Sequence, residues 1–202
     1  RKGPVFSNII LADEINRSPA KVQSALLESM QEKQVTIGDD SYKLDLPFLV
    51  LATQNPIDQE GTYPLPEAQR DRFMMKLNVD YPSKEEELKI MQRMSDLNFK
   101  KSTKTILNKK DITAIQNEIN KVSISESIEK YIIEIVNATR KPSSVKLNEF
   151  EDYISFGASP RASINLSLAS KANAFLSNRN YVMPDDVKEI AHDVLNHRII
   201  SV

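Results

Sequence analysis

The sequence predicts an α/β part over residues 1–82, followed by an all-α part over residues 83–202. Residues 5–12 form a largely apolar run, which is typical of a parallel strand covered on both faces, and residues 48–53 form a second apolar run. Beyond Pro82 no strand pattern is convincing, and apolar residues recur at helical spacing instead. This change of pattern indicates a parallel sheet with helices that is joined to a helical bundle.

Composition limits the possible classes of protein. The 202 residues suffice for one large or two small domains, and 40% hydrophobic with 27% charged residues is ordinary for a globular chain. A formal net charge of −1 gives no electrostatic case for a nucleic-acid partner or a polybasic membrane anchor. No apolar stretch approaches the roughly 20 residues of a membrane span. The absence of cysteine excludes disulfides and thiolate metal sites. We therefore expect a cytoplasmic protein with no membrane span.

Local signals fix the order of the elements before Pro82. Ser18-Pro19 is typical of the N-cap and first position of a helix, and Gly38 marks the turn of a hairpin. The expected elements after the first strand are a helix from Ser18-Pro19 to about Glu32, a hairpin over residues 34–46, the strand 48–53, a loop over 57–66, a short helix over 67–75 and a strand over 76–81.

The all-α part begins with Ser83 and Glu86, which together form a capping box. Later helices are marked by apolar residues three and four positions apart. They are indicated by Ile112, Ile115, Ile119 and Val122; by Ile128, Ile132, Ile135 and Val136; by residues 159–176; and by Val187, Ile190, Ala191, Val194 and Leu195 after Pro184-Asp185.

Two adjacent carboxylates, Asp13 and Glu14, follow the first apolar run directly. Four apolar residues followed by Asp-Glu form the Walker B pattern, at the sheet edge where ligands bind in open α/β folds. Asp13 would then hold the Mg²⁺ of a nucleoside triphosphate through water, and Glu14 would polarise the attacking water. The alternative is a strand that ends in a solvated acidic turn.

Asn55 follows the second apolar run at the same expected edge. An amide there could bond both the γ-phosphate and the attacking water, as a γ-phosphate sensor must. An Asn-Pro pair alone is most often a turn former. The order of strand, helix, hairpin and strand favours the sensor.

Four long runs make the prediction more specific. They are "GPVFSNIILADEINRSPAKVQSALLESMQEKQVTIG", "FLVLATQNPIDQEGTYPLPEAQRDRF", "GASPRASINLSLASKA" and "YVMPDDVKEIAHDVLNHRI". These runs are spread from residue 3 to residue 199 and resemble the MoxR family of AAA+ ATPases, and the resemblance covers nearly the whole chain. The resemblance implies a partial AAA+ core over residues 1–82, with a helical lid domain over residues 83–202.

The resemblance also implies roles for individual residues. Asp13 and Glu14 match Walker B, and Asn55 matches sensor 1. Arg72, in "DRF", matches the arginine finger that acts on the nucleotide of the neighbouring subunit, and Arg161, in "GASPRAS", matches sensor 2. A planar guanidinium suits both arginine roles because it can bind two phosphate oxygens.

Some positions leave alternatives open. Gly157 and Pro160 would set the turn and the first helical position that present Arg161. This chain has Arg70 where the family usually has an apolar residue, so either Arg70 or Arg72 could be the finger. We assign the finger to Arg72 and interpret Arg70 as a surface charge, because arginines two positions apart on a helix point in different directions.

Other candidates are weaker. Residues 35–46 resemble the hairpin before sensor 1, which contacts substrates or relays nucleotide state, although a plain sheet-edge hairpin is an equal alternative. Arg17, four residues after Asp13, is either an interface residue or an exposed charge at the start of a helix. His192 and His197 are interpreted as packing or surface residues and not as ligands.

A complete phosphate cradle would need the pattern GxxxxGK[ST], and none of the four glycines begins one. We therefore expect this chain to be the later part of a longer protein that supplies Walker A. Such a MoxR-type ATPase would bind ATP and Mg²⁺, form a homo-oligomeric ring, expected to be a hexamer, and remodel or mature a protein client, often with a von Willebrand factor A-domain partner. Two alternatives remain: a non-catalytic interaction module, and a related motor such as a magnesium-chelatase ATPase subunit.

Overall fold

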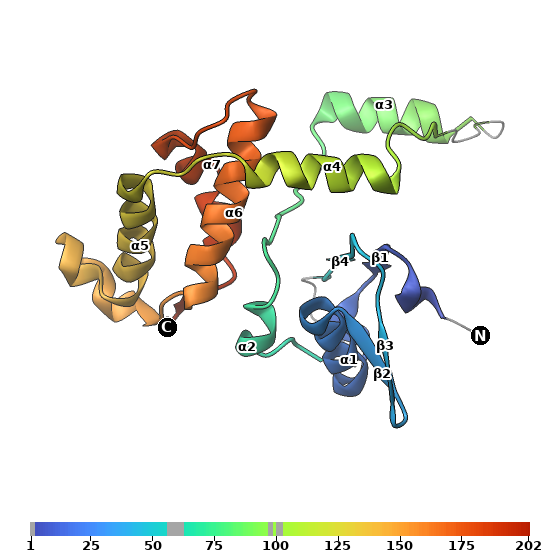
Figure 1. Ribbon diagram of the computed structural model, residues 1–202, viewed down its shortest axis with the longest axis horizontal. Helices are drawn as coiled ribbons and strands as arrows, with labels where there is room; N and C mark the ends of the chain where they lie inside the picture. Colours follow the sequence, from blue (N-terminus) through green and yellow to red (C-terminus); the bar gives the residue numbers. More distant parts are fainter. Residues whose placement is uncertain (1–2, 56–62, 97–98, 100–102) are drawn as a thin grey trace.

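The computed structural model describes residues 3–55, 63–96, 99 and 103–202. The predicted α/β part followed by a helical part is confirmed (Figure 1). In Figure 1 strands β1 to β4 and α1 form one lobe, α5, α6 and α7 form another, and the segment after α2 runs between them. Most of the predicted loop 57–66 lies outside the described residues.

The α/β lobe is built on a parallel pair of strands. The helices and strands of this lobe are β1 (Ile9–Ala12), α1 (Ala20–Glu32), β2 (Gln34–Ile37), β3 (Asp40–Lys43), β4 (Leu49–Ala52) and α2 (Glu67–Arg70). β1 pairs with β4, and β2 and β3 form the predicted hairpin. The hydrophobic core of this lobe consists of Ile15, Leu27 and Leu65, and Phe73 packs against it.

Only one face of the parallel pair is covered within the described residues. Ile9 and Leu11 of β1 are 65% and 64% exposed, and Leu49 and Leu51 of β4 lie on the same open face. The prediction of a strand covered on both faces is therefore wrong for the chain described here. β1 also starts later than predicted, because Pro4–Phe6 form a 3₁₀ turn in which the Ser7 N–H bonds the Pro4 carbonyl.

Two further predictions in this lobe need correction. α1 begins at Ala20 with Pro19 as its N-cap and no side-chain cap, so Ser18 is not the capping residue. Residues 76–81 are not a strand: no described strand pairs with them, and Tyr81 is 98% exposed. Alternating apolar residues form a strand only where a ladder partner satisfies their backbone groups.

The helical lobe contains α3 (Lys84–Met94), α4 (Lys109–Asn120), α5 (Glu126–Arg140), α6 (Pro160–Leu176) and α7 (Pro184–Leu195). The predicted capping box of Ser83 and Glu86 is confirmed. The prediction that no strand follows residue 82 is wrong, because β5 (Ile154–Phe156) pairs with β6 (Ile200–Ser201). These strands are too short to produce a recognisable alternation.

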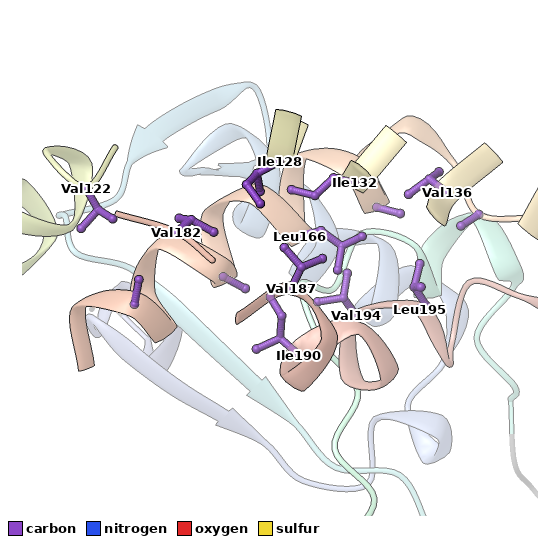
Figure 2. Packing of buried hydrophobic residues seen from close by; sticks show 14 residues of the cluster. Val122, Ile128, Ile132, Val136, Leu166, Val182, Val187, Ile190, Val194 and Leu195 are labelled. Carbon is purple, nitrogen blue, oxygen red and sulfur yellow. The ribbon is translucent and has the colours of Figure 1, made fainter. Parts of the chain in front are cut away.

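The core of the helical lobe lies where α5, α6 and α7 meet (Figure 2). Ile132 and Val136 of α5 lie near Leu166 of α6, and Val187 and Val194 of α7 complete the same cluster. Each such side chain contributes about 1.5–3 kcal/mol when fully buried. This core fixes α6, the helix that carries Arg161 near its first turn.

Gly157 is needed for close approach and not for an unusual backbone angle. A Cβ placed there would lie 2.4 Å from the carbonyl oxygen of Thr139 and 2.6 Å from the backbone nitrogen of Arg140. Two residues later Ser159 caps α6, and Pro160 occupies its first turn as predicted. The segment that starts the helix is therefore pressed directly against the end of α5.

We predict that Gly157→Ala destabilises the protein by roughly 3 kcal/mol, because the new methyl group meets backbone that cannot rotate away. Urea unfolding should show a lower midpoint with an unchanged slope. Gly3→Ala is the matched control, since a Cβ at Gly3 meets nothing within 4 Å. Equal unfolding free energies for the two variants would contradict the close-packing explanation.

Candidate nucleotide site

The parallel register places the ends of β1 and β4 side by side. Ala12 pairs with Ala52, so Asp13 and Thr53 leave the sheet together. The Thr53 hydroxyl donates to Oδ1 of Asp13 at 2.5 Å and accepts from the Glu14 N–H at 2.8 Å. Thr53, which was missed from the sequence, therefore fixes both members of the acidic pair. Only the register of β1 and β4 indicates this role of Thr53.

Glu14 adopts an uncommon backbone conformation, with φ of 48° and ψ of 54°. A non-glycine residue in this left-handed region costs roughly 1–3 kcal/mol and persists where its surroundings hold it. Its carboxylate lies 3.0 Å from a guanidinium nitrogen of Arg17 and 3.5 Å from Nδ2 of Asn55, the latter a long contact. The structure thus brings Asp13, Glu14 and Asn55 together at one edge of the sheet, and pairs Arg17 with Glu14.

A buried amide supports the loop behind this edge. Gln23 of α1 is 1% exposed, and its Nε2 lies 2.9–3.1 Å from the carbonyl oxygens of Ile15, Ser18 and Tyr63. Because a buried amide without partners would be costly, these contacts tie the turn after Glu14 to α1. The pattern of the sequence gave no indication of this role.

The donor set at this edge is compatible with a hard cation. Asp13 is exposed, and carboxylate oxygens are the ligands that Mg²⁺ takes from proteins, with most other positions filled by water and phosphate. Within the described ranges, no group of three or more His, Cys, Asp or Glu side chains is arranged to bind a metal. Asp13 would therefore act as a single protein carboxylate beside phosphate oxygens.

A second cluster forms around Asp71, directly after α2. The Ser159 hydroxyl donates to both carboxylate oxygens of Asp71, at 2.8 and 2.9 Å. Arg161 donates to the same carboxylate at 3.0 Å, so the predicted sensor 2 arginine is held by the chain's own α/β part. Among the recorded interactions of described residues, none joins Arg161 to Asp13 or Glu14.

Arg198 completes this Asp71 cluster from within the helical lobe. Its side chain is 0% exposed, and its Nε donates to Asp71 at 3.0 Å. The remaining guanidinium donors reach backbone carbonyls of Asp71, Phe73, Met74 and Val194. A buried guanidinium is tolerated only when it is paired and its donors are satisfied. The neighbouring His197 is also buried, and its Nε2 lies 3.1 Å from the Phe73 carbonyl.

The charges of this cluster shift two pKa values. Burial, the largest influence on Asp71, raises its pKa, but hydrogen bonds from Ser159 and Arg161 and the charges of Arg198 and Arg161 outweigh burial and lower the pKa below its ordinary value. Burial and the charge of Arg198 lower the pKa of His197 from 6.5 to about 4. Asp71 is therefore ionised and His197 neutral near pH 7.

The two candidate finger arginines, Arg70 and Arg72, differ in their exposure. Arg72 is exposed, whereas Arg70 is half-buried, with its Nε buried and without a hydrogen-bond partner in the described part of the chain. Arg70 is thus less of a surface charge than predicted. The predicted roles of Asp13, Glu14, Asn55, Arg72 and Arg161 in binding or catalysis stay predictions.

Two other features of the described residues lie outside these clusters. His192 is exposed. No helix among the described residues is long and apolar enough to cross a membrane.

Comparison with known proteins shows to which class of protein this chain belongs. Residues 1–75 match the family described as the ATPase family associated with various cellular activities (AAA), and residues 149–202 match the AAA lid domain. An α/β lobe with an acidic pair at its sheet edge, continued by a matching lid, defines part of an AAA+ protein. The chain is 49% identical to the chaperone MoxR1 of Mycobacterium tuberculosis over 98% of its length, and 46% identical to YeaC of Bacillus subtilis over 99%. It belongs to the MoxR family of AAA+ ATPases.

Solved structures agree with this family. A crystal structure of a Cytophaga hutchinsonii protein described as a candidate ATPase is 65% identical, with a TM-score of 0.94 over 100% of this chain and 61% of that one. A Methanopyrus kandleri MCM homolog at 17% identity and a TM-score of 0.60, matched over 95% of this chain and 38% of its own, shares the fold alone. The chain spans 52% of MoxR1 and 60% of YeaC, so it corresponds to a little over half of these relatives.

The acid sensitivity of His197 gives a testable consequence. Protonation would place a proton on its buried Nδ1, which has no partner among the described residues and lies beside the charged Arg198. The unfolded residue, with a pKa near 6.5, binds a proton where the folded one, near 4, does not. We predict that the free energy of unfolding falls as pH drops from 6.5 to 4, by up to about 1.4 kcal/mol per pH unit.

His197→Gln, which keeps an amide donor for the Phe73 carbonyl, should flatten this part of the pH profile. Urea unfolding at a series of pH values measures the slope for the wild type and the variant. His192→Gln, at an exposed position, serves as the control and should keep the wild-type slope. The same steep slope in His197→Gln would assign the acid sensitivity to other groups.

Proposed function

We propose that this chain forms part of an ATPase that couples ATP binding and hydrolysis to the remodelling of protein clients. The observation that carries the proposal is the shared edge of β1 and β4. There the Thr53 hydroxyl holds Asp13 and the backbone of Glu14, and Asn55 approaches the Glu14 carboxylate. An edge that carries two carboxylates and an amide at the ends of parallel strands has the chemistry needed to bind a nucleotide and orient water.

Each residue has a distinct task in this proposal. Asp13 binds the cation that accompanies ATP, and Glu14 accepts hydrogen bonds from the attacking water and polarises it. Asn55 donates to a phosphate oxygen or to that water. Arg17, which pairs with Glu14 at 3.0 Å, holds this carboxylate at the sheet edge. When Mg²⁺ is bound, it neutralises phosphate charge beside Asp13.

The proposal requires a phosphate-binding loop from outside these 202 residues, since no GxxxxGK[ST] occurs within them. MoxR1 and YeaC extend beyond the matched region, which leaves room for such a segment in relatives. An intact acidic edge without any such loop in the whole protein would instead favour a non-catalytic interaction module.

The proposal includes assembly. In a homo-oligomeric ring, proposed to be a hexamer, exposed Arg72 would reach the nucleotide of the neighbouring subunit and stabilise developing charge on the transferred phosphate. The hairpin of β2 and β3, which extends from the α/β lobe in Figure 1, would contact a client or relay nucleotide state. A protein client and a von Willebrand factor A-domain partner belong to the same proposal.

Glu14→Gln in the full-length protein tests the proposed hydrolysis. We expect ATP affinity to stay within about threefold, while turnover falls at least about 100-fold because the amide cannot polarise water. Titration with a fluorescent ATP analogue and a phosphate-release assay measure the two quantities. Glu32→Gln at the exposed end of α1 is the matched control and should keep both. Equal losses of binding and turnover would remove the water-polarising role of Glu14.

Arg72→Ala tests action between subunits. We expect rings made only of Arg72→Ala subunits to show no turnover. Rings that mix these subunits with Glu14→Gln subunits should regain part of it, because some interfaces then combine an intact Glu14 with an intact Arg72. Phosphate release across mixing ratios measures the recovery. Arg70→Ala is the control and should keep activity. Recovery that is absent from every mixture, or loss of activity in Arg70→Ala alone, would overturn the assignment of the finger to Arg72.

A further inference from the structure

The Asp71 cluster contains a feature that the proposed function does not use. Asp71 binds Arg161 of the lid and immediately precedes Arg72, the residue proposed to reach the neighbouring subunit. We propose that Asp71 is a positioning residue: it holds Arg161 until nucleotide phosphate competes for that guanidinium, and the release is transmitted to Arg72. This inference rests on the proposed function, since it needs nucleotide at the site.

The two arginines on Asp71 differ in how readily they can leave. The Arg198 side chain is 0% exposed, and backbone carbonyls also accept from its guanidinium. Separating Arg198 from Asp71 would therefore leave a buried charge without its partner. Arg161 is 48% exposed, and the interaction recorded for its side-chain charge is the 3.0 Å pair with Asp71. A partly exposed pair of this kind is weak enough to be exchanged for another anion. Asp71 therefore has one permanent and one replaceable cationic partner.

Phosphate is the anion best suited to replace Asp71. It offers several oxygens and more negative charge than a carboxylate, and a guanidinium can bind two of its oxygens in a planar, bidentate manner. Ser159 keeps Asp71 hydrogen-bonded after Arg161 leaves, and the same hydroxyl accepts from the backbone N–H of Arg161 at 3.1 Å. Loss of the Arg161 side-chain contact therefore leaves the start of α6 in place.

Release of Arg161 has a short path to Arg72. The N–H of Asp71, directly after α2, donates to the carbonyl of Glu67, the first residue of that helix, and the Asp71 carbonyl accepts from Arg198 at 3.1 Å. Asp71 thus connects the one-turn helix α2 to the buried guanidinium of Arg198 in the lid. A change in the forces on its carboxylate changes the direction in which the next residue leaves α2. Nucleotide bound in one subunit would in this way change the orientation of Arg72, which reaches the site of the next subunit.

A double-mutant cycle in the full-length protein tests this role, with fluorescent ADP as the probe. Asp71→Asn frees Arg161 and should tighten ADP binding about threefold to fivefold, the range of a weak exchanged ion pair. Arg161→Gln should weaken binding, and adding Asp71→Asn to it should change nothing further, since no guanidinium remains to be freed. Asp80→Asn, at an exposed position of the connecting segment, is the control and should leave the affinity unchanged.

A purely structural role predicts a different result. Loss of the counter-charge of Arg198 lowers stability in both backgrounds, so a structural effect on ADP affinity would be the same with and without Arg161. Equal effects in the two backgrounds, or no tightening in Asp71→Asn, would overturn the positioning role. If the wild type binds no ADP, the proposed function fails too. Binding with additive effects overturns only the role of Asp71.

A second measurement does not depend on whether Asp71→Asn folds. Hydrogen exchange of residues 67–75 is compared with and without saturating ADP, in the wild type and in Arg161→Gln, whose side chain is partly exposed. We expect ADP to raise exchange in this segment at least twofold in the wild type and to leave it unchanged in the variant. The same response in both proteins, or no response in the wild type, would contradict transmission through Arg161 and Asp71.

Discussion

The structure depends on one buried charge. The guanidinium of Arg198 is enclosed in the helical lobe, and it is satisfied mainly by the chain between Asp71 and Met74. Because removing its partners would leave an unpaired charge in a dry site, the lid cannot slide along this segment. Packing agrees with the hydrogen bonds: Phe73 packs against the α/β core, whereas Met75 packs against the core of the helical lobe. Residues 71–75 thus connect the two cores.

This connection decides where the lid arginine can lie. Ser159 and Arg161 open α6, and Gly157 allows that start to press against the end of α5. With Arg198 fixed on one side of Asp71, the contact of Arg161 on the other side is the adjustable part of the cluster. The buried His197 adds a neutral packing surface beside it, at the cost of stability in acid.

Sequence reasoning found what local patterns encode. The placement of Asp13, Glu14 and Asn55 at one edge of the sheet was predictable, because each follows an apolar run and parallel strands bring such ends together. Thr53 was missed because its role comes from register: Ala12 pairs with Ala52, and no local pattern states which residues will face each other. Arg198 was missed for a stronger reason, since its carboxylate partner Asp71 lies 127 positions away.

The wrong predictions have related causes. Residues 76–81 have a strand-like composition, but no described strand pairs with them, so apolar alternation alone misled. Gly157 was expected to set a turn, and its need for close approach was not foreseen: a Cβ there would lie 2.4 Å from the Thr139 carbonyl oxygen. Both outcomes depend on what lies opposite in space. A single sequence does not contain that information in any local window.

The two clusters also differ in how firmly they are held, and this difference fits the proposed hydrolytic function. The acidic edge is fixed within one lobe: Thr53 bonds Asp13 and Glu14, and Gln23 holds the turn behind them. Even the strained backbone of Glu14 is kept in place by these contacts. The lid arginine, in contrast, rests on an exchangeable pair. Groups that orient water need fixed positions because small displacements are costly in catalysis, whereas a group that reports on phosphate must be able to change partners.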